Sequence, residues 1–247
     1  MTCQPKGALC HDVHRRAAFQ EIAMPKTKSS STRRVECPRC GKAITVEVVS
    51  SLRPGDKHLA ALMSGTLNRA TCPGCKVEFL VETSLVYLDG QTSFIVYLLE
   101  PPEDGDTEAL EHEVDCMATE VFSQENLERP QVRLTFTYPD FLEKIKLHSL
   151  GYDDRLIEYA KYQLFRNISE ELLSKFQHKL LLDFSNRDKD KLIFLVYDRE
   201  TNKPLSAVHV PMEDFRTLER EFAANLTMQQ ELDAIFPTCH VSADRLL

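Results

Sequence analysis

The chain has 247 residues, of which 43% are hydrophobic and 28% charged, and its formal net charge is −8. This is the composition of a globular protein with one large or two smaller domains, and we expect two. The longest apolar runs are far shorter than the roughly 20 residues that a membrane-spanning helix needs, so the composition excludes a membrane-spanning protein and a membrane partner is not expected.

The first 34 residues are polar and basic. They carry seven Lys and Arg residues against two acidic residues and show no sustained hydrophobic period, which predicts a disordered basic extension over residues 1–34. Met24 lies just ahead of the most cationic run, and one hypothesis is that Met24 is the true start of translation. Because this region contains no apolar stretch of the length of a secretory signal, we expect a cytoplasmic protein, whose thiols stay reduced.

The next segment opens with a cysteine pair, Cys37 and Cys40, in a Cys-Pro-X-Cys sequence. Alternating β-branched residues after it predict a strand over 43–49. A Pro-Gly-Asp break follows, and the apolar spacing beyond it predicts a short helix that Gly65 ends. This helix is an insertion ahead of a second cysteine pair.

The second Cys-Pro-X-Cys sequence contains Cys72 and Cys75 and leads into a β-forming run at 77–87. A further β-forming run at 92–99 follows an Asp-Gly pair at 89–90. Because Asp-Gly between two such runs is a hairpin signal, we predict an antiparallel sheet here.

Residues 100–129 carry eleven Asp and Glu residues against one Arg. Apolar residues recur in this segment at helical spacing, which predicts an acidic amphipathic helix. Beyond it the pattern predicts a strand at 132–136, a helix at 140–148 and a long helix from 153 to about 176. Three further strands, expected at 179–184, 192–197 and 205–210, form a predicted β-meander. Two predicted helices follow the meander.

The four paired cysteines predict a zinc site whose ligands are Cys37, Cys40, Cys72 and Cys75. Zinc takes four ligands in a tetrahedron, and each Cys-X-X-Cys turn directs two sulfurs at one ion. Four thiolates close the coordination shell, whereas a catalytic zinc keeps a position open for water, so the predicted zinc is structural. Iron is the alternative ion, since four sulfurs in a tetrahedron accept either metal.

A redox role is the competing interpretation of the cysteines, because Cys-Pro-X-Cys is also a dithiol pattern when it begins a helix in a βαβ unit. Each pair here is followed by a β-forming run, and there are two pairs where a redox site needs one. The sequence also contains no Gly-rich phosphate loop, nucleophile elbow or His-Glu-X-X-His helix. We therefore predict no catalytic and no cofactor-binding residues besides the zinc ligands.

Six short segments resemble one known family in content and order, and they are Glu36-Cys-Pro-Arg-Cys-Gly41, Ser64-Gly65-Thr66-Leu67-Asn68, Cys72-Pro-Gly-Cys75, Tyr87-Leu88-Asp89, Phe141-Leu142-Glu143-Lys144-Ile145 and Asp153-Asp154-Arg155. Over residues 35–164 the chain resembles the CpXC domain, a bacterial and archaeal family without an assigned function. The family usually has Gly after the second cysteine pair, where this chain has Lys76, which leaves the local turn geometry open. The resemblance implies metal binding and supplies no substrate.

The predicted fold class is α+β. Residues 35–130 are expected to form a zinc-ribbon-like antiparallel β module with a helical insertion and the acidic helix. Residues 131–247 are expected to form a C-terminal domain of helices and a three-stranded β-meander.

The leading functional hypothesis is a non-catalytic, zinc-stabilised interaction protein whose partner is another protein. Residues 35–99 carry six basic and six acidic residues and lack the basic excess of a nucleic-acid-binding module. Nucleic-acid binding by the ribbon, assisted by the basic tail, stays open as an alternative, as does an enzyme with a site in the C-terminal domain. The oligomeric state is left undetermined.

Overall fold

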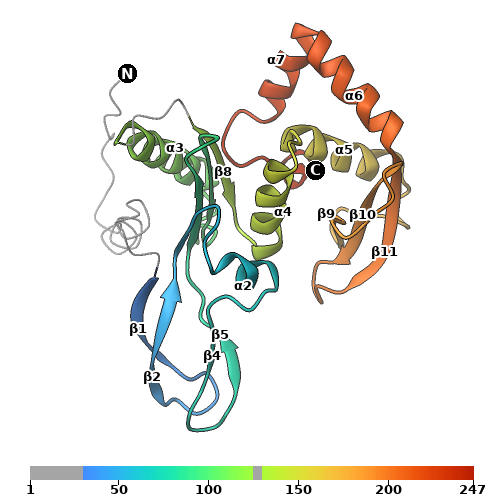
Figure 1. Cartoon of the computed structure of the whole chain (residues 1–247). Helices are drawn as coiled ribbons and strands as arrows, with labels where there is room; N and C mark the ends of the chain where they lie inside the picture. Colours follow the sequence, from blue (N-terminus) through green and yellow to red (C-terminus); the bar gives the residue numbers. More distant parts are fainter. Residues whose placement is uncertain (1–29, 125–129) are drawn as a thin grey trace. The chain divides into compact units, whose positions relative to one another are not determined.

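The computed structural model describes residues 30–124 and 130–247 (Figure 1). The chain divides into two compact units, residues 1–138 and residues 139–247, which are described separately. In the described ranges the fold is mixed α+β, with four small sheets and six α-helices. No helix in these ranges is both long and apolar enough to cross a membrane.

Two antiparallel β-hairpins carry the cysteine pairs. Their strands are β1 (Ser30–Glu36) with β2 (Ala43–Val49), and β4 (Arg69–Thr71) with β5 (Glu78–Leu80). We call the loops between the paired strands the first knuckle, residues 37–42, and the second knuckle, residues 72–77. The inserted helix α2 (Leu59–Met63) lies between the hairpins in sequence, as predicted.

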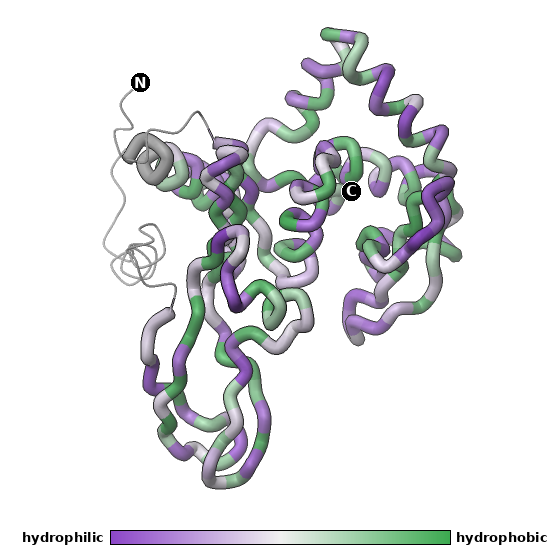
Figure 2. The backbone as a smooth tube through the Cα atoms, viewed as in Figure 1, coloured by the Kyte–Doolittle hydropathy of each residue, from purple (hydrophilic) through white to green (hydrophobic). Residues whose placement is uncertain are grey.

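Both hairpins contribute to one small hydrophobic cluster. Its buried members are Ile44, Val48, Ala70 and Val81, and Figure 2 shows both hydrophobic and hydrophilic residues along the two hairpins. A cluster of this size buries little apolar surface, and domains with so small a core commonly depend on a disulfide or a metal.

Strand β1 was not predicted. Residues 30–34 were assigned to the disordered extension, but they pair with β2 from Ser30↔Val49 to Glu36↔Ala43. The residues of this strand are mostly polar and show no hydrophobic alternation that would predict a strand. The strand forms because β2 pairs with it. The rest of the predicted extension, including Met24, lies outside the described residues.

A four-stranded sheet completes the first unit. Its order is β3-β6-β7-β8, and the strands are β3 (Ser51–Leu52), β6 (Leu85–Asp89), β7 (Phe94–Leu98) and β8 (Gln131–Thr135). β6 and β7 form the predicted antiparallel hairpin, whereas β7 and β8 are parallel. The acidic helix α3 (Thr107–Gln124) connects β7 with β8, so it is the crossover of a βαβ unit, and it buries Leu110 and Val114.

Two details of this region differ from the prediction. The run 77–87 divides into β5 and β6, which belong to different sheets. The Val81 N–H still donates to the Asn68 carbonyl and so continues the β4–β5 pairing by one residue, and residues 81–84 then separate the two strands. The β6–β7 turn spans residues 90–93, and Ser93 has the left-handed conformation there with φ of 51°. Asp-Gly therefore marks the turn without forming a two-residue turn.

The boundary between the units also differs from the predicted one at residue 130. The strand predicted at 132–136 was assigned to the C-terminal domain, but as β8 it pairs with β7, and the first unit extends to Tyr138. A parallel pairing across a long helical connection leaves no signal in the local sequence, which explains the error.

The second unit contains the predicted meander as a sheet of order β11-β10-β9. Its strands are β9 (His178–Leu182), β10 (Lys191–Asp198) and β11 (Pro204–Pro211). The helices are α4 (Tyr138–Ser149), α5 (Asp154–Asn167), α6 (Met212–Ala224) and α7 (Leu226–Ile235), followed by a short 3-10 turn, η1 (Ala243–Leu246). One face of the sheet joins α5, α6 and α7 in a core that includes Phe194, Ile157 and Phe215.

Helix α5 is shorter than predicted. Asp153 caps its start, as expected, but the helix ends at Asn167 and not near residue 176. Ile168 is extended, with ψ of 140°, and short turns follow it. Asn and β-branched Ile are both weak helix formers, and together they end the helix although apolar residues continue beyond it.

Candidate metal centre

The two knuckles have the same backbone hydrogen bonds. In the first, the Cys37 N–H donates to the Lys42 carbonyl at 3.0 Å and the Gly41 N–H to the Cys37 carbonyl at 2.9 Å. In the second, the Cys72 N–H donates to the Val77 carbonyl and the Lys76 N–H to the Cys72 carbonyl, both at 2.9 Å. Each knuckle is thus a closed turn that presents two cysteine side chains.

The fifth residue of each knuckle is left-handed. Gly41 has φ of 69° and Lys76, at the equivalent place, has φ of 62°. The turn geometry that the sequence left open at Lys76 is therefore the same as at Gly41. A residue with a side chain pays about 1–2 kcal/mol for this conformation, whereas Gly adopts it freely.

The four cysteine sulfurs converge. All four Sγ atoms lie within 4.8 Å of one another, and two pairs that each join both knuckles, Cys37 with Cys75 and Cys40 with Cys72, are 3.6 Å apart. The four cysteines are not in disulfides, whose sulfurs lie about 2.05 Å apart. In a tetrahedral thiolate site with metal–sulfur bonds of about 2.3 Å, neighbouring sulfurs lie about 3.8 Å apart. The donor set fits a metal ion.

Burial differs within each cysteine pair. Cys37 of the first knuckle and Cys72 of the second are 2% and 0% exposed, whereas Cys40 is exposed and Cys75 is partly buried. One sulfur from each knuckle is therefore enclosed by the hairpins, and the other two lie towards solvent. A metal ion can reach this group of sulfurs from outside without unfolding the hairpins.

The sulfurs influence one another's acidity. The backbone N–H of Cys75 lowers the pKa of the Cys72 thiol to about 6, with help from the Gly74 N–H and against the effect of burial. The backbone N–H of Lys42 also lowers the pKa of Cys40, but hydrogen bonds with the three neighbouring sulfurs outweigh it and raise that pKa to about 12. One thiolate thus forms readily, and further ionisation needs a cation to offset the accumulated negative charge.

Gly74 allows the two knuckles to approach closely. A Cβ atom at this position would lie 3.1 Å from Cδ of Lys42, 3.7 Å from the Cys72 sulfur and 3.9 Å from the Cys40 sulfur. The aliphatic part of Lys42 therefore crosses the second knuckle, where its charge can offset thiolates. A side chain at residue 74 would push against it.

Asn68 links the two hairpins. Its carboxamide accepts a hydrogen bond from the Val49 N–H and donates one to the Val49 carbonyl, both at 2.8 Å. Its own carbonyl accepts from the Val81 N–H at 2.9 Å, and its φ of 58° is one that Asn tolerates better than most residues. The sequence showed Asn68 as part of a family motif but gave no sign of this role.

Paired cysteine hairpins whose four sulfurs meet define a protein with a four-cysteine group that could bind a metal ion. The chain belongs to the CpXC family, since the family model described as CpXC protein matches residues 35–161. Comparisons with curated proteins and with solved structures found no match.

The matched segment extends into the second unit, where it includes a buried group of charges that sequence analysis missed. We call it the ionic cluster, and its members are Glu143 and Lys144 of α4 with Asp154, Glu158 and Lys161 of α5; their side chains are 2–6% exposed. Lys144 lies 3.0 Å from both Asp154 and Glu158, and Lys161 lies 2.5 Å from Glu143 and 3.1 Å from Glu158.

The ionic cluster also binds backbone groups. Glu143 accepts from the Leu182 N–H at 2.6 Å and Glu158 from the Ala243 N–H at 3.0 Å. Burial raises the pKa of Glu158, but Lys144 and Lys161 outweigh it and bring the value to about 2. The carboxylates are thus paired and enclosed, which indicates a structural role. In the sequence, the spacing of Asp154, Glu158 and Lys161 indicates that they share one face of a helix. The same spacing is equally typical of a helix face exposed to solvent, so it does not predict burial.

Proposed function

We propose that this CpXC protein is a non-catalytic, zinc-stabilised interaction protein in which Cys37, Cys40, Cys72 and Cys75 hold one Zn²⁺. The observation that carries the proposal is that four sulfurs from two knuckles lie within 4.8 Å of one another. A cytoplasmic location would suit it, because reduced thiols remain available to a metal there.

The proposed zinc has a structural role. Four thiolates fill a tetrahedral shell and leave no position for water or substrate. When bound, zinc typically supplies on the order of 10 kcal/mol of folding free energy, which the small cluster around Ile44 and Val48 would otherwise lack. Two cysteine hairpins around one ion are the arrangement of a zinc ribbon, and we propose that relationship for residues 30–80.

Two features of the first unit support a protein partner. Leu80, at the end of β5, is 48% exposed. It borders a cavity of about 290 Å³ whose apolar lining includes Leu67, Leu98 and Phe136. Together with the balanced charge of residues 35–99, an exposed apolar side chain beside an apolar hollow fits an apolar segment of a protein better than it fits a polyanion.

The test combines metal analysis with partner capture. Protein purified without chelators is expected to contain one zinc per chain, and Cys72→Ser is expected to lose it and to yield partly unfolded protein. Capture from native lysate should recover the same partner with wild-type protein and lose it with Leu80→Asp, which leaves the four cysteines in place. A chain that is folded without metal would refute the structural role, and equal capture by Leu80→Asp would refute this surface.

A further inference from the structure

Strand β11 is an exposed edge of the sheet in the second unit (Figure 1). It pairs only with β10 among the strands that the structure describes. Leu205 is 57% exposed, and Ser206, Ala207 and His209 are exposed as well. The strand thus presents a long stretch of its backbone to solvent.

Two hydrogen bonds show which backbone groups face outward. The Met212 N–H donates to the Asp190 carbonyl at 2.8 Å, and the Asp183 N–H donates to the Ile193 carbonyl at 2.8 Å. Hydrogen-bonded and non-hydrogen-bonded pairs alternate along an antiparallel ladder. Val208 and Val210 therefore direct their N–H and C=O groups at β10, whereas Ala207 and His209 direct theirs away from the sheet.

The opposite edge of the same sheet is protected. Along β9, the outward N–H of Leu182 donates to the carboxylate of Glu143 in the ionic cluster. In the ranges 30–124 and 130–247, no comparable bond reaches the outward groups of Ala207 or His209. The β9 edge is thus covered, since Leu180 and Leu182 are both buried, whereas Ala207 and His209 on the β11 edge are exposed.

The open edge lacks the usual protection against strand pairing. Edge strands are commonly blocked by charged residues or by an internal proline, but the interior of β11 reads Leu-Ser-Ala-Val-His-Val from 205 to 210. Pro204 and Pro211 stand only at its two ends. A bulge near the first end, opposite Val196 and Tyr197, leaves residues 206–210 in regular strand geometry.

We propose that β11 pairs antiparallel with β11 of a second copy of this chain, about a two-fold axis at Val208. In this register Ala207 of each copy lies opposite His209 of the other. The outward N–H and C=O groups of these two residues are then satisfied by four hydrogen bonds, and the two three-stranded sheets become one of six strands.

Charge at the ends of the strand fits the same register. Lys203 precedes β11 and Glu213 follows it, and both are exposed. The two-fold axis brings Lys203 of one copy to the end of the strand at which Glu213 of the second copy lies. Strand pairing in this register therefore joins opposite charges at both ends, and it places no charge of like sign opposite another within the strand.

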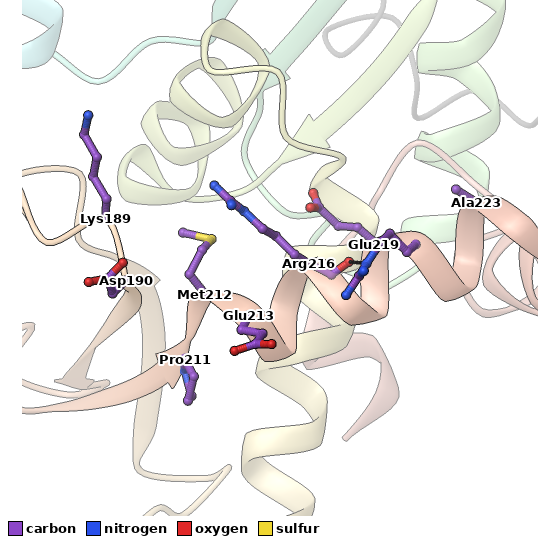
Figure 3. A pocket seen from close by; sticks show the side chains of 9 residues that line it. Lys189, Asp190, Pro211, Met212, Glu213, Arg216, Glu219 and Ala223 are labelled. Carbon is purple, nitrogen blue, oxygen red and sulfur yellow. Dashed lines mark hydrogen bonds between the residues drawn. The ribbon is translucent and has the colours of Figure 1, made fainter.

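A hollow at that end has room for the approaching chain. It has a volume of about 910 Å³ and lies between the turn at Lys189 and Asp190 and the start of α6, with Glu213 and Arg216 on its wall (Figure 3). The turn between β10 and β11 of the second copy, which carries Lys203, would enter it. Strand pairing alone covers less than the roughly 1,200 Å² of a stable interface, so the dimer is expected to dissociate in the micromolar range.

The test measures the molar mass and the hydrogen exchange of the full chain from low micromolar to several hundred micromolar concentration. Sedimentation is expected to show a reversible monomer–dimer equilibrium. The amides of Ala207 and His209 should gain protection as the concentration rises, whereas those of Val208 and Val210, which already bond β10, should not change. A chain that stays monomeric, or a dimer in which the first two amides exchange freely, would overturn the proposal.

Two sets of variants locate the interface. Ala207→Pro removes an outward N–H that β10 does not use, so it should weaken the dimer about tenfold or more and keep the fold, whereas Ala207→Ser keeps the donor and should dimerise normally. If the proline variant fails to fold, a charge exchange decides the matter. Lys203→Glu and Glu213→Lys should each weaken the dimer several-fold, and the double variant should restore it. Dimerisation unchanged by either single charge variant would contradict this register.

Discussion

The carboxamide of Asn68 is hydrogen-bonded twice to the backbone of Val49, through its oxygen to the N–H and through its nitrogen to the carbonyl, each at 2.8 Å. Val49 is the last residue of the first hairpin, and Asn68 directly precedes the second. One side chain thus sets the distance between two hairpins whose sulfurs must meet.

Asn68→Gly is expected to destabilise the first unit by about 1–3 kcal/mol, because the backbone groups of Val49 lose both partners. Gly accepts the left-handed φ at this position, so the loss reports the side chain and not backbone strain. Asn202→Gly is the matched control, since Asn202 is also left-handed, with φ of 53°, and lies in an exposed turn. Thermal unfolding of both variants checks this, and equal shifts would contradict the linking role of Asn68.

Lys76→Gly is expected to stabilise the metal-loaded protein by about 1 kcal/mol, because it removes the strain of a left-handed lysine in the second knuckle. Gly41→Ala, at the equivalent place in the first knuckle, should destabilise it by a similar amount. The melting temperatures of the two variants should therefore move in opposite directions. Movement in the same direction would show that the knuckles are not equivalent.

Lys161→Met should destabilise the second unit by about 3–5 kcal/mol, because Glu143 and Glu158 would lose a cation in a buried setting. Lys179→Met is the comparison, since Lys179 and Asp140 form a more exposed ion pair, at 18% and 28%, which is worth at most about 1 kcal/mol. Denaturant unfolding followed by circular dichroism measures both. Similar losses for the two would show that the ionic cluster adds no more than a surface pair.

The apparent metal affinity should rise with pH from about 6 to about 9, since metal and protons compete for the same sulfurs. Cys72, with its pKa lowered to about 6, is already a thiolate above that pH, so fewer than four protons are released. Cys40, with its pKa raised to about 12, still has a proton to lose, so the affinity should continue to rise at pH 9. Competition with a chromophoric chelator across this range tests the sign. An affinity independent of pH would argue against thiolate ligation.

The sequence predicted what local chemistry determines. The cysteine turns, the strand after the first of them, the inserted helix and the three-stranded meander all carry their own signals in spacing and residue type. Cys37 and Cys72 could be assigned to one site because few other arrangements make use of two Cys-Pro-X-Cys turns.

What the sequence did not reveal depends on partners distant in the chain. Strand β1 exists because β2 pairs with it, and β8 belongs to the first unit because β7 pairs with it across a helix. The ionic cluster places Lys144 and Glu158 in the interior, where charged residues are rare. A pattern of charges on a helix face cannot show whether that face meets solvent or another helix.

Metal analysis with X-ray absorption spectroscopy of protein purified without chelators tests the central claim most directly. We predict one zinc per chain, bound by four sulfurs at about 2.3 Å, with the metal lost in Cys72→Ser and retained in Cys239→Ser, which alters a cysteine of the second unit. Protein that is folded without a stoichiometric metal, or a metal bound by fewer than four sulfurs, would contradict the account.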